Sequence, residues 1–147
     1  MAREKLIVMF NKALELEHAA RIQYLAHVEE LKGLGCEPII ARLKEIAGDE
    51  QKHEGMWREC ITMLDGSCSM KLAPTYGAKE TTKILEINLK AEKEAVDFYT
   101  QIYEELKKSK AELKYQYEFL EHSVRHVLIA EQEHIFEIDT LLDKKAP

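Results

Sequence analysis

Apolar residues recur at helical spacing through four long segments of this chain, and this periodicity limits the fold more than any other feature. It predicts helices over about 3–32, 38–66 and 79–108, and a fourth that follows Ser109. Ser109 and Glu112 fit a capping box at that start, while a start one turn later, near Tyr115, stays open. Only 6 glycines and 3 prolines occur in 147 residues, which favours long helices over strands and turns. An all-α, four-helix bundle is therefore expected.

The connections between the segments predict how the helices pair. Short turns join the first helix to the second and the third to the fourth, which makes each pair an antiparallel hairpin. Residues 65–78 connect the hairpins, and fully extended they reach about 46–50 Å. A helix of about 28 residues is roughly 42 Å long, so this crossover can run the whole length of the bundle. The hairpins would then be related by a pseudo-twofold axis. Leu72 and Tyr76 favour a packed crossover over a disordered one.

Composition and charge exclude several classes of protein. The length predicts one domain, 1–147. A net charge of −6 argues against nucleic acid and anionic membranes as partners. No apolar run approaches the roughly 20 residues of a membrane span, and the first residues do not resemble a signal peptide. Cys36, Cys60 and Cys68 lack CxxC spacing, which favours free thiols in a reducing cytoplasm and excludes a four-cysteine iron site within the chain.

A glutamate interrupts the apolar stripe of each predicted helix: Glu17, Glu50, Glu92 and Glu131. His53 and His134 follow Glu50 and Glu131 by three residues, which places a carboxylate and an imidazole on one helix face. An unpaired buried carboxylate costs several kcal/mol, and two divalent cations would offset that cost for all four. Two Glu-x-x-His pairs and two single glutamates that face inward are the ligand set of a dinuclear carboxylate site.

The positions of the Glu-x-x-His pairs along the chain, more than their number, make this pattern informative. With 22 glutamates and 6 histidines, chance supplies about one Glu-x-x-His pair, and Glu15 with His18 makes a third. The other two pairs, however, lie on the second helix of each hairpin. An internal repeat aligns Glu17, Ala20 and Tyr24 with Glu92, Ala95 and Tyr99. It favours Glu17 over Glu15, and Glu92 over Glu94, with Glu94 left as an alternative.

Three segments resemble helix motifs of the bacterioferritins: ELEHAARIQYLAH, DEQKH and EQEH. Over nearly its whole length the chain is similar to the ferritin-like superfamily, near the bacterioferritins and rubrerythrins. The resemblance implies a non-haem di-iron domain in which Glu50 and Glu131 bridge the metals. It places Glu17 and His53 on one iron, and Glu92 and His134 on the other.

Three departures from the family refine this expectation. Gln51 stands where a bacterioferritin has its haem-ligating methionine, so no haem is expected there. Only thirteen residues follow His134, too few for the fifth helix of the bacterioferritin cage, so a homodimer is favoured over a 24-subunit store. Because no rubredoxin segment is present, a peroxidase of the rubrerythrin type would need an external electron donor such as rubredoxin.

Three functional hypotheses follow. Carboxylate and imidazole ligands suit Fe(II), Mn(II) or Zn(II), which favours a di-iron oxidase or peroxidase that acts on Fe(II), O2 or H2O2 in iron or oxidative-stress handling. Tyr24 and Tyr99 are then either core aromatics or hydrogen-bond donors to metal-bound carboxylates. A di-iron hydroxylase of an organic substrate would need an apolar cavity beside Glu17 and Glu92. A non-catalytic helical interaction protein is the third hypothesis. His122 and His126, at i and i+4, are either a metal clamp or ordinary surface residues.

Overall fold

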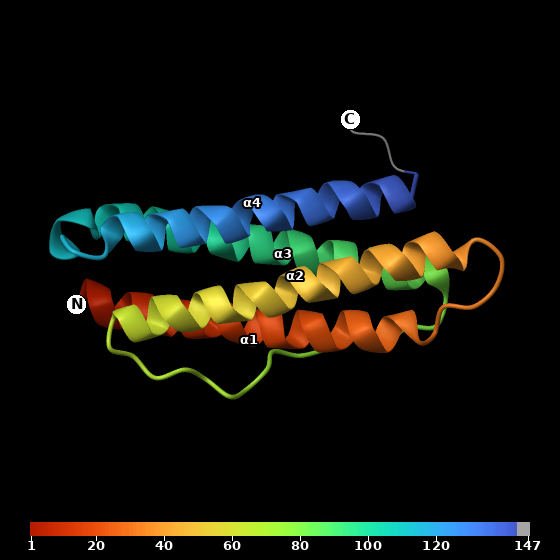
Figure 1. Ribbon diagram of the computed structural model, residues 1–147, viewed down its shortest axis with the longest axis horizontal. Helices are drawn as coiled ribbons and strands as arrows, with labels where there is room; N and C mark the ends of the chain where they lie inside the picture. Colours follow the sequence, from red (N-terminus) through yellow and green to blue (C-terminus); the bar gives the residue numbers. More distant parts are fainter. Residues whose placement is uncertain (144–147) are drawn as a thin grey trace.

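The computed structural model describes residues 1–143, which form four long helices and no strand (Figure 1). The elements are α1 (Ala2–Val28), α2 (Cys36–Met63), α3 (Thr81–Lys108), the short 3-10 helix η1 (Lys110–Glu112) and α4 (Tyr117–Leu141). α1 and α2 form one hairpin and α3 and α4 the other, and all four run along one bundle axis (Figure 1). The predicted four-helix bundle is confirmed. Residues 144–147, part of the segment judged too short for a fifth helix, lie outside the described range. No helix within that range is long and apolar enough to cross a membrane.

The turn of the first hairpin depends on two glycines. Gly33 and Gly35 have φ angles of 103° and 85°, in the left-handed region that glycine adopts without strain. α1 ends at Val28, four residues before the predicted end, and α2 begins directly after Gly35. Pro38 lies in the first turn of α2. Backbone nitrogens there donate no intrahelical hydrogen bond, so the missing amide hydrogen of proline costs nothing.

The second hairpin differs from the prediction. The Ser109 hydroxyl donates a hydrogen bond to the Glu105 carbonyl at 2.9 Å, inside the last turn of α3, and caps no following helix. The capping box is therefore wrong. Leu113 is buried, so the chain first makes the 3-10 turn that brings this side chain into the core. α4 then begins at Tyr117, close to the alternative start near Tyr115.

The crossover runs along α1, from one end of the bundle to the other, as predicted (Figure 1). Three hydrogen bonds, in chain order, fasten it there: Asn11 Nδ2 to the Ser67 carbonyl at 2.9 Å, the Ala73 amide to the Glu15 carbonyl at 3.0 Å, and the Tyr76 amide to Gln23 Oε1 at 2.8 Å. The acceptors and donors on α1 advance in the same direction as the crossover residues. This parallel course returns the chain to the end of the bundle where α1 ends, so α3 starts there.

The reason given for a packed crossover was nevertheless wrong. Leu72 is 48% exposed and Tyr76 is 62% exposed, so neither side chain anchors the segment in the core. The crossover is held by polar contacts with α1 instead. The packed crossover was thus predicted correctly, but from two side chains that do not hold it.

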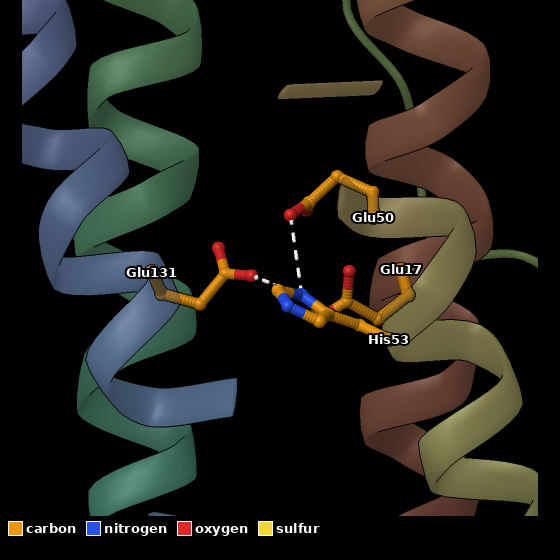
Figure 2. Close-up of side chains that lie close together, drawn as sticks. All are labelled: Glu17, Glu50, His53 and Glu131. Carbon is orange, nitrogen blue, oxygen red and sulfur yellow. Dashed lines mark hydrogen bonds and ion pairs between the residues drawn. The ribbon is translucent and has the colours of Figure 1, made fainter. Parts of the chain in front are cut away.

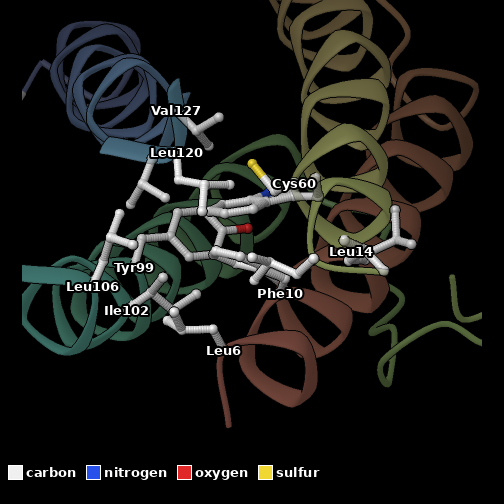
Figure 3. Close-up of a cluster of buried hydrophobic side chains, with 14 of the residues drawn as sticks. Leu6, Phe10, Leu14, Cys60, Tyr99, Ile102, Leu106, Leu120 and Val127 are labelled. Carbon is white, nitrogen blue, oxygen red and sulfur yellow. The ribbon is translucent and has the colours of Figure 1, made fainter. Parts of the chain in front are cut away.

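Two apolar clusters form the core, one toward each end of the bundle. The first gathers around Phe10 and Tyr99 (Figure 3). It also contains Trp57, whose ring centre lies 5.1 Å from that of Tyr99. The second includes Leu43 and Ile84. Between the two clusters, the buried positions of all four helices carry charged or polar side chains. The apolar ends thus hold a polar layer in a fixed place.

Candidate metal centre

Six ionisable side chains meet in the buried polar layer: Glu17 from α1, Glu50 and His53 from α2, Glu92 from α3, and Glu131 and His134 from α4. Each is at most 3% exposed. These are the six residues that the sequence predicted to meet. Figure 2 shows four of them pointing into the space between the two hairpins, three from the α1–α2 side and Glu131 from α4. Helical spacing places them at one level because a carboxylate and an imidazole three residues apart share a helix face.

The six side chains form two overlapping groups. In one, ligand atoms of Glu17, Glu50, His53 and Glu131 all lie within 4.8 Å of one another. In the other, the same holds for Glu50, Glu92, Glu131 and His134. Glu50 and Glu131 belong to both groups, and each group also holds one further glutamate and one histidine. Two neighbouring cations that share two carboxylates require this arrangement.

Each histidine turns the same ring nitrogen toward three carboxylates. His53 Nδ1 lies 3.0 Å from Glu131 Oε1, 3.5 Å from Glu50 Oε1 and 3.7 Å from Glu17 Oε1 (Figure 2). His134 Nδ1 lies 3.3 Å from Glu50 Oε1, with an oxygen of Glu92 at 3.5 Å and one of Glu131 at 3.6 Å. The nitrogen and the oxygens of each group therefore converge on one small volume.

Several of these atoms are buried without a hydrogen bond. In the described part of the chain, no hydrogen bond forms at five of these atoms: Glu17 Oε2, Glu50 Oε1, Glu92 Oε2, Glu131 Oε2 and His134 Nδ1. An unsatisfied buried polar group costs about 1–3 kcal/mol, and more when it is charged. Such a concentration of unpaired acceptors is expected where a bound cation supplies the missing partner.

Burial strongly perturbs the carboxyl groups. It is the main cause that raises the pKa of Glu17 to about 7, with the charge of Glu131 adding to it. Burial, then the charge of Glu17, raises the pKa of Glu50 to about 7. Burial, then the charge of Glu131, raises the pKa of Glu92 to about 8. Without a cation, this layer therefore keeps protons near neutral pH that exposed glutamates would have released.

For the two histidines, burial and the nearby carboxylates shift the pKa in opposite directions. Burial alone would lower the pKa of His53, but its contacts with Glu131, Glu17 and Glu50 raise it to about 12. The pKa of His134 is also raised, because its contacts with Glu131, Glu50 and Glu92 outweigh burial. Imidazolium ions thus supply positive charge in the metal-free centre, and a metal ion would replace their protons.

Two tyrosines support the outer carboxylates across the bundle. The Tyr24 hydroxyl on α1 donates to Glu92 Oε1 on α3 at 2.6 Å, and the Tyr99 hydroxyl on α3 donates to Glu17 Oε1 on α1 at 2.7 Å. The two pairs follow the internal repeat of the sequence. Burial, and then the charge of the nearby glutamates, raises the pKa of both hydroxyls well above the usual value, so both keep their protons and remain donors. Of the two roles proposed for these tyrosines, the hydrogen bonds favour the second.

Residues 7–145 match the protein family described as Ferritin-like domain. The chain belongs to this family. The match spans the four helices and the whole buried layer. The predicted ferritin-like fold, with its long crossover between α2 and α3, is thereby confirmed.

Solved structures with this ferritin-like fold come from several bacteria. A ferritin-like, diiron-carboxylate protein from Bacillus anthracis str. Ames has a TM-score of 0.86 and 23% identity, over 97% of this chain and 98% of that one. A bacterioferritin from Desulfovibrio desulfuricans, described with its diiron site in different catalytic states, has a TM-score of 0.84 and 21% identity, covering 95% and 79%. A dodecameric thioferritin from Bacteroides fragilis has a TM-score of 0.83 and 20% identity, covering 96% and 86%. At these identities the likeness shows the fold. A comparison with curated proteins finds no match.

One further residue, Asp49, contacts the ferritin-like centre of this chain, and the sequence did not predict it. Asp49 Oδ2 lies 3.0 Å from His134 Nε2, the ring nitrogen that faces away from the carboxylates. A carboxylate at this nitrogen fixes the orientation of a metal-binding imidazole and increases its basicity. Asp49 directly precedes Glu50, but its contact is with another helix, so sequence spacing gave no signal for it.

A small cavity adjoins the centre on the α1–α3 side. It has a volume of about 120 Å³, and Tyr24, Glu50, Glu92, Tyr99 and Glu131 are among its lining residues. Ala73 and Pro74 of the crossover also line it. The crossover thus lies beside the route from this side of the bundle to the carboxylates.

A buried hydrogen-bond network holds the crossover over this side of the bundle. Asn88 accepts a bond from Gln23 Nε2 at 2.9 Å, and its own Nδ2 lies 2.9 Å from His27 Nδ1. His27 Nε2 in turn contacts the Tyr76 carbonyl at 2.8 Å. The sequence signal for this network is a polar residue, Asn88, on the apolar stripe of α3.

The competing ligand candidates from the sequence have other positions. Glu94 is exposed, and Glu15 accepts a hydrogen bond from Ser69 Oγ at 2.6 Å. His18 Nδ1 contacts the Lys71 carbonyl at 2.7 Å, so the third Glu-x-x-His pair holds the crossover. Gln51 is exposed on α2, and the prediction that no haem binds there stays a prediction.

Proposed function

We propose that this ferritin-like chain binds two iron ions through the six buried ligands, and that it oxidises Fe(II) or reduces O2 or H2O2 in iron or oxidative-stress handling. The ligands are Glu17, Glu50, His53, Glu92, Glu131 and His134. One observation carries the proposal: two buried four-residue groups share Glu50 and Glu131, and each of their four glutamates has one buried oxygen without a hydrogen bond. The proteins of B. anthracis and D. desulfuricans that share the fold are described as diiron proteins, which supports the same metal here.

The donor set fits this metal. Carboxylate oxygens and imidazole nitrogens bind Fe(II), and also Mn(II) or Zn(II), so iron is proposed over the other two from the family and not from affinity. Four carboxylates could together balance the charge of two divalent cations. The groups would bind the first cation through Glu17 and His53 and the second through Glu92 and His134, with Glu50 and Glu131 between them.

Two iron ions, when bound, can together supply two electrons to dioxygen or peroxide. The chain's own residues provide the setting. Tyr24 and Tyr99 hold Glu92 and Glu17 by hydrogen bonds, which restrains these two carboxylates where they would receive the metal ions. Both hydroxyls keep their protons, so they stabilise negative charge on the carboxylates. The apolar clusters on either side limit the access of bulk water.

The adjoining cavity favours a small oxidant over an organic substrate. Its volume of about 120 Å³ is below the roughly 150 Å³ of a cavity that admits benzene, and well below the roughly 300–1,000 Å³ of typical ligand pockets. Dioxygen and hydrogen peroxide fit in such a space. A di-iron hydroxylase of a larger organic molecule would need the crossover to move.

Anaerobic titration with Fe(II), followed by addition of O2 or H2O2, tests the proposal. We expect about two iron ions per chain, and Fe(II) oxidation that consumes the oxidant. The Glu50→Ala, Glu131→Ala double variant should lose both properties, because each ligand group loses two members. The matched control is Glu45→Ala with Glu133→Ala, which removes exposed glutamates from the same two helices. Iron oxidation that persists in the first variant would refute the proposal, and a wild-type chain that binds no metal would favour the interaction-protein hypothesis.

The partners of the reaction are also part of the proposal. A homodimer in a reducing cytoplasm, and an external electron donor such as rubredoxin when H2O2 is the oxidant, remain predictions from the sequence. Sedimentation of the iron-loaded chain tests the dimer. Peroxide reduction with and without added reduced rubredoxin tests the donor.

A further inference from the structure

Four of the chain's 6 histidines lie in a row that leads from the surface of α4 into the metal centre. The ring centres of His122 and His126 are 6.3 Å apart, those of His126 and His53 are 6.5 Å apart, and those of His53 and His134 are 6.2 Å apart. His122 and His126 are exposed, whereas His53 and His134 are buried ligands of the centre. We call these four residues the histidine row.

The other two histidines have structural partners. His18 and His27 use ring nitrogens for contacts with carbonyls of the crossover, at 2.7 Å and 2.8 Å. The outer nitrogen of His134 is likewise occupied, because it contacts Asp49 at 3.0 Å. At the other ligand group, the next ring outward from His53 is exposed His126. The row thus gives the Glu17–His53 group an imidazole connection to solvent.

The outer pair of the row has the spacing of a chelate. Residues at i and i+4 lie on one helix face, and two such histidines can bind one metal ion. With metal–nitrogen distances of about 2.0–2.1 Å, a shared ion would hold the two ring centres roughly 5 Å apart. The present 6.3 Å must therefore shorten by about 1 Å, and the two exposed side chains can make that adjustment by rotating. Arg125, between them in sequence, pairs with Glu121 at 2.8 Å, which balances the nearest positive charge.

We propose that His122 and His126 bind one divalent transition-metal ion at the surface of α4, and that this ion is the loading position for the Glu17–His53 group. The loading role rests on the proposed function, because the ion would move on to the buried centre. The surface site itself does not depend on that function. A metal ion held one ring away from His53 has a high effective concentration at the centre, so transfer inward needs no diffusion through the bundle.

The binding part is tested with Co(II), which avoids oxidation chemistry, added to metal-free protein and followed by calorimetry. Glu50→Ala with Glu131→Ala disables the buried centre, and this variant should still bind one Co(II) per chain. Adding His122→Gln and His126→Gln should abolish that remaining ion. No ion in the first variant, or an ion that persists after the glutamine changes, overturns the proposal.

The loading part is tested by stopped-flow absorption of Co(II) uptake at a limiting metal concentration. His122→Gln with His126→Gln should slow uptake by about fivefold to tenfold while the buried capacity stays the same. The matched control is Phe119→Gln with Ile129→Gln, two exposed uncharged residues of the same helix α4, and it should load at the wild-type rate. An unchanged rate in the histidine variant overturns the loading role. If wild-type protein takes up no buried ion, the proposed function fails together with the loading role, while the surface site is still judged by the calorimetry.

Discussion

The metal-free protein is expected to lose stability as the pH rises from about 5 to about 8. The carboxyls of Glu17 and Glu50 have pKa values raised from 4.5 to about 7, and that of Glu92 to about 8. Between pH 4.5 and these values, the folded chain holds protons that the unfolded chain has released. Folding is favoured by these groups below pH 4.5 and loses that advantage as the pH rises through the folded-state pKa. The raised pKa of His53 has the same sign, with its contribution lost from pH 6.5 upward.

The size of the effect follows from the burial of these groups. A pKa raised by about 2.5 corresponds to roughly 3 kcal/mol for one isolated group. The carboxyls and imidazoles share one small volume, so their titrations are coupled and the individual values do not add. We therefore expect a loss of at least about 3 kcal/mol across this pH range, which is a large part of a typical stability of about 5–15 kcal/mol.

Urea unfolding of chelator-treated protein at several pH values, followed by circular dichroism, measures this dependence. The Zn(II)-loaded protein is the comparison, because metal binding displaces protons and its stabilisation grows as the pH rises. Glu50→Gln is the second comparison, since the neutral amide cannot titrate, and its metal-free form should depend less on pH than the wild type. A metal-free stability that is constant or rises between pH about 5 and about 8 would show that the buried carboxyls do not titrate as inferred.

Two further substitutions probe the surroundings of the centre, and a third probes the start of the crossover. Tyr99→Phe removes a hydrogen bond to a buried carboxylate and should destabilise the metal-free protein by about 1–3 kcal/mol in urea unfolding, whereas an unchanged midpoint would mean that this bond contributes nothing. Asp49→Ala leaves the outer nitrogen of His134 without its carboxylate and should weaken metal binding by about 10-fold or more in chelator competition; equal affinity would remove Asp49 from the site. Gly66→Ala places a methyl group 2.8 Å from Ile7 Cγ2 and should cost about 1–3 kcal/mol, to be compared with Gly55→Ala, whose new methyl has no neighbour within 4 Å.

The sequence predicted the helices and the six side chains that meet in the buried layer, because both depend on local spacing. Apolar periodicity places side chains on one face of a helix, and Glu-x-x-His pairs lie on one face for the same reason. The internal repeat then selected Glu17 and Glu92, because equivalent positions of two similar hairpins meet at the same level of the bundle. The structure brings both of them to the centre and leaves Glu94 exposed.

Local competition between hydrogen bonds explains the errors at the second hairpin. Ser109 fits a capping box in sequence, but its hydroxyl can also bond back to the Glu105 carbonyl, and the burial of Leu113 decides between these options. That burial depends on the packing of the other helices. A local motif could therefore not locate the start of α4.

Contacts between helices were the least predictable part of the site. Asp49 contacts His134 across 85 residues, and His53 lies beside His126 on another helix. Neither pairing leaves a mark in sequence spacing, because helix rotation about the bundle axis determines both. The internal repeat placed Tyr24 and Tyr99 at equivalent positions of the two hairpins. Only the fold shows that Tyr24 bonds to Glu92 and Tyr99 to Glu17.

The division of the core into two apolar clusters and one acidic layer connects stability with function. The clusters around Phe10 and Leu43 bury large side chains at both ends of the bundle, so the helices stay aligned even though the middle layer contains unpaired acceptors. That alignment keeps ligand atoms within 4.8 Å of one another in two groups at once, a geometry that costs stability in the metal-free chain and favours binding of two cations. An acidic layer of this kind is unfavourable in a purely structural bundle, and it is expected where cation binding is the function of the fold.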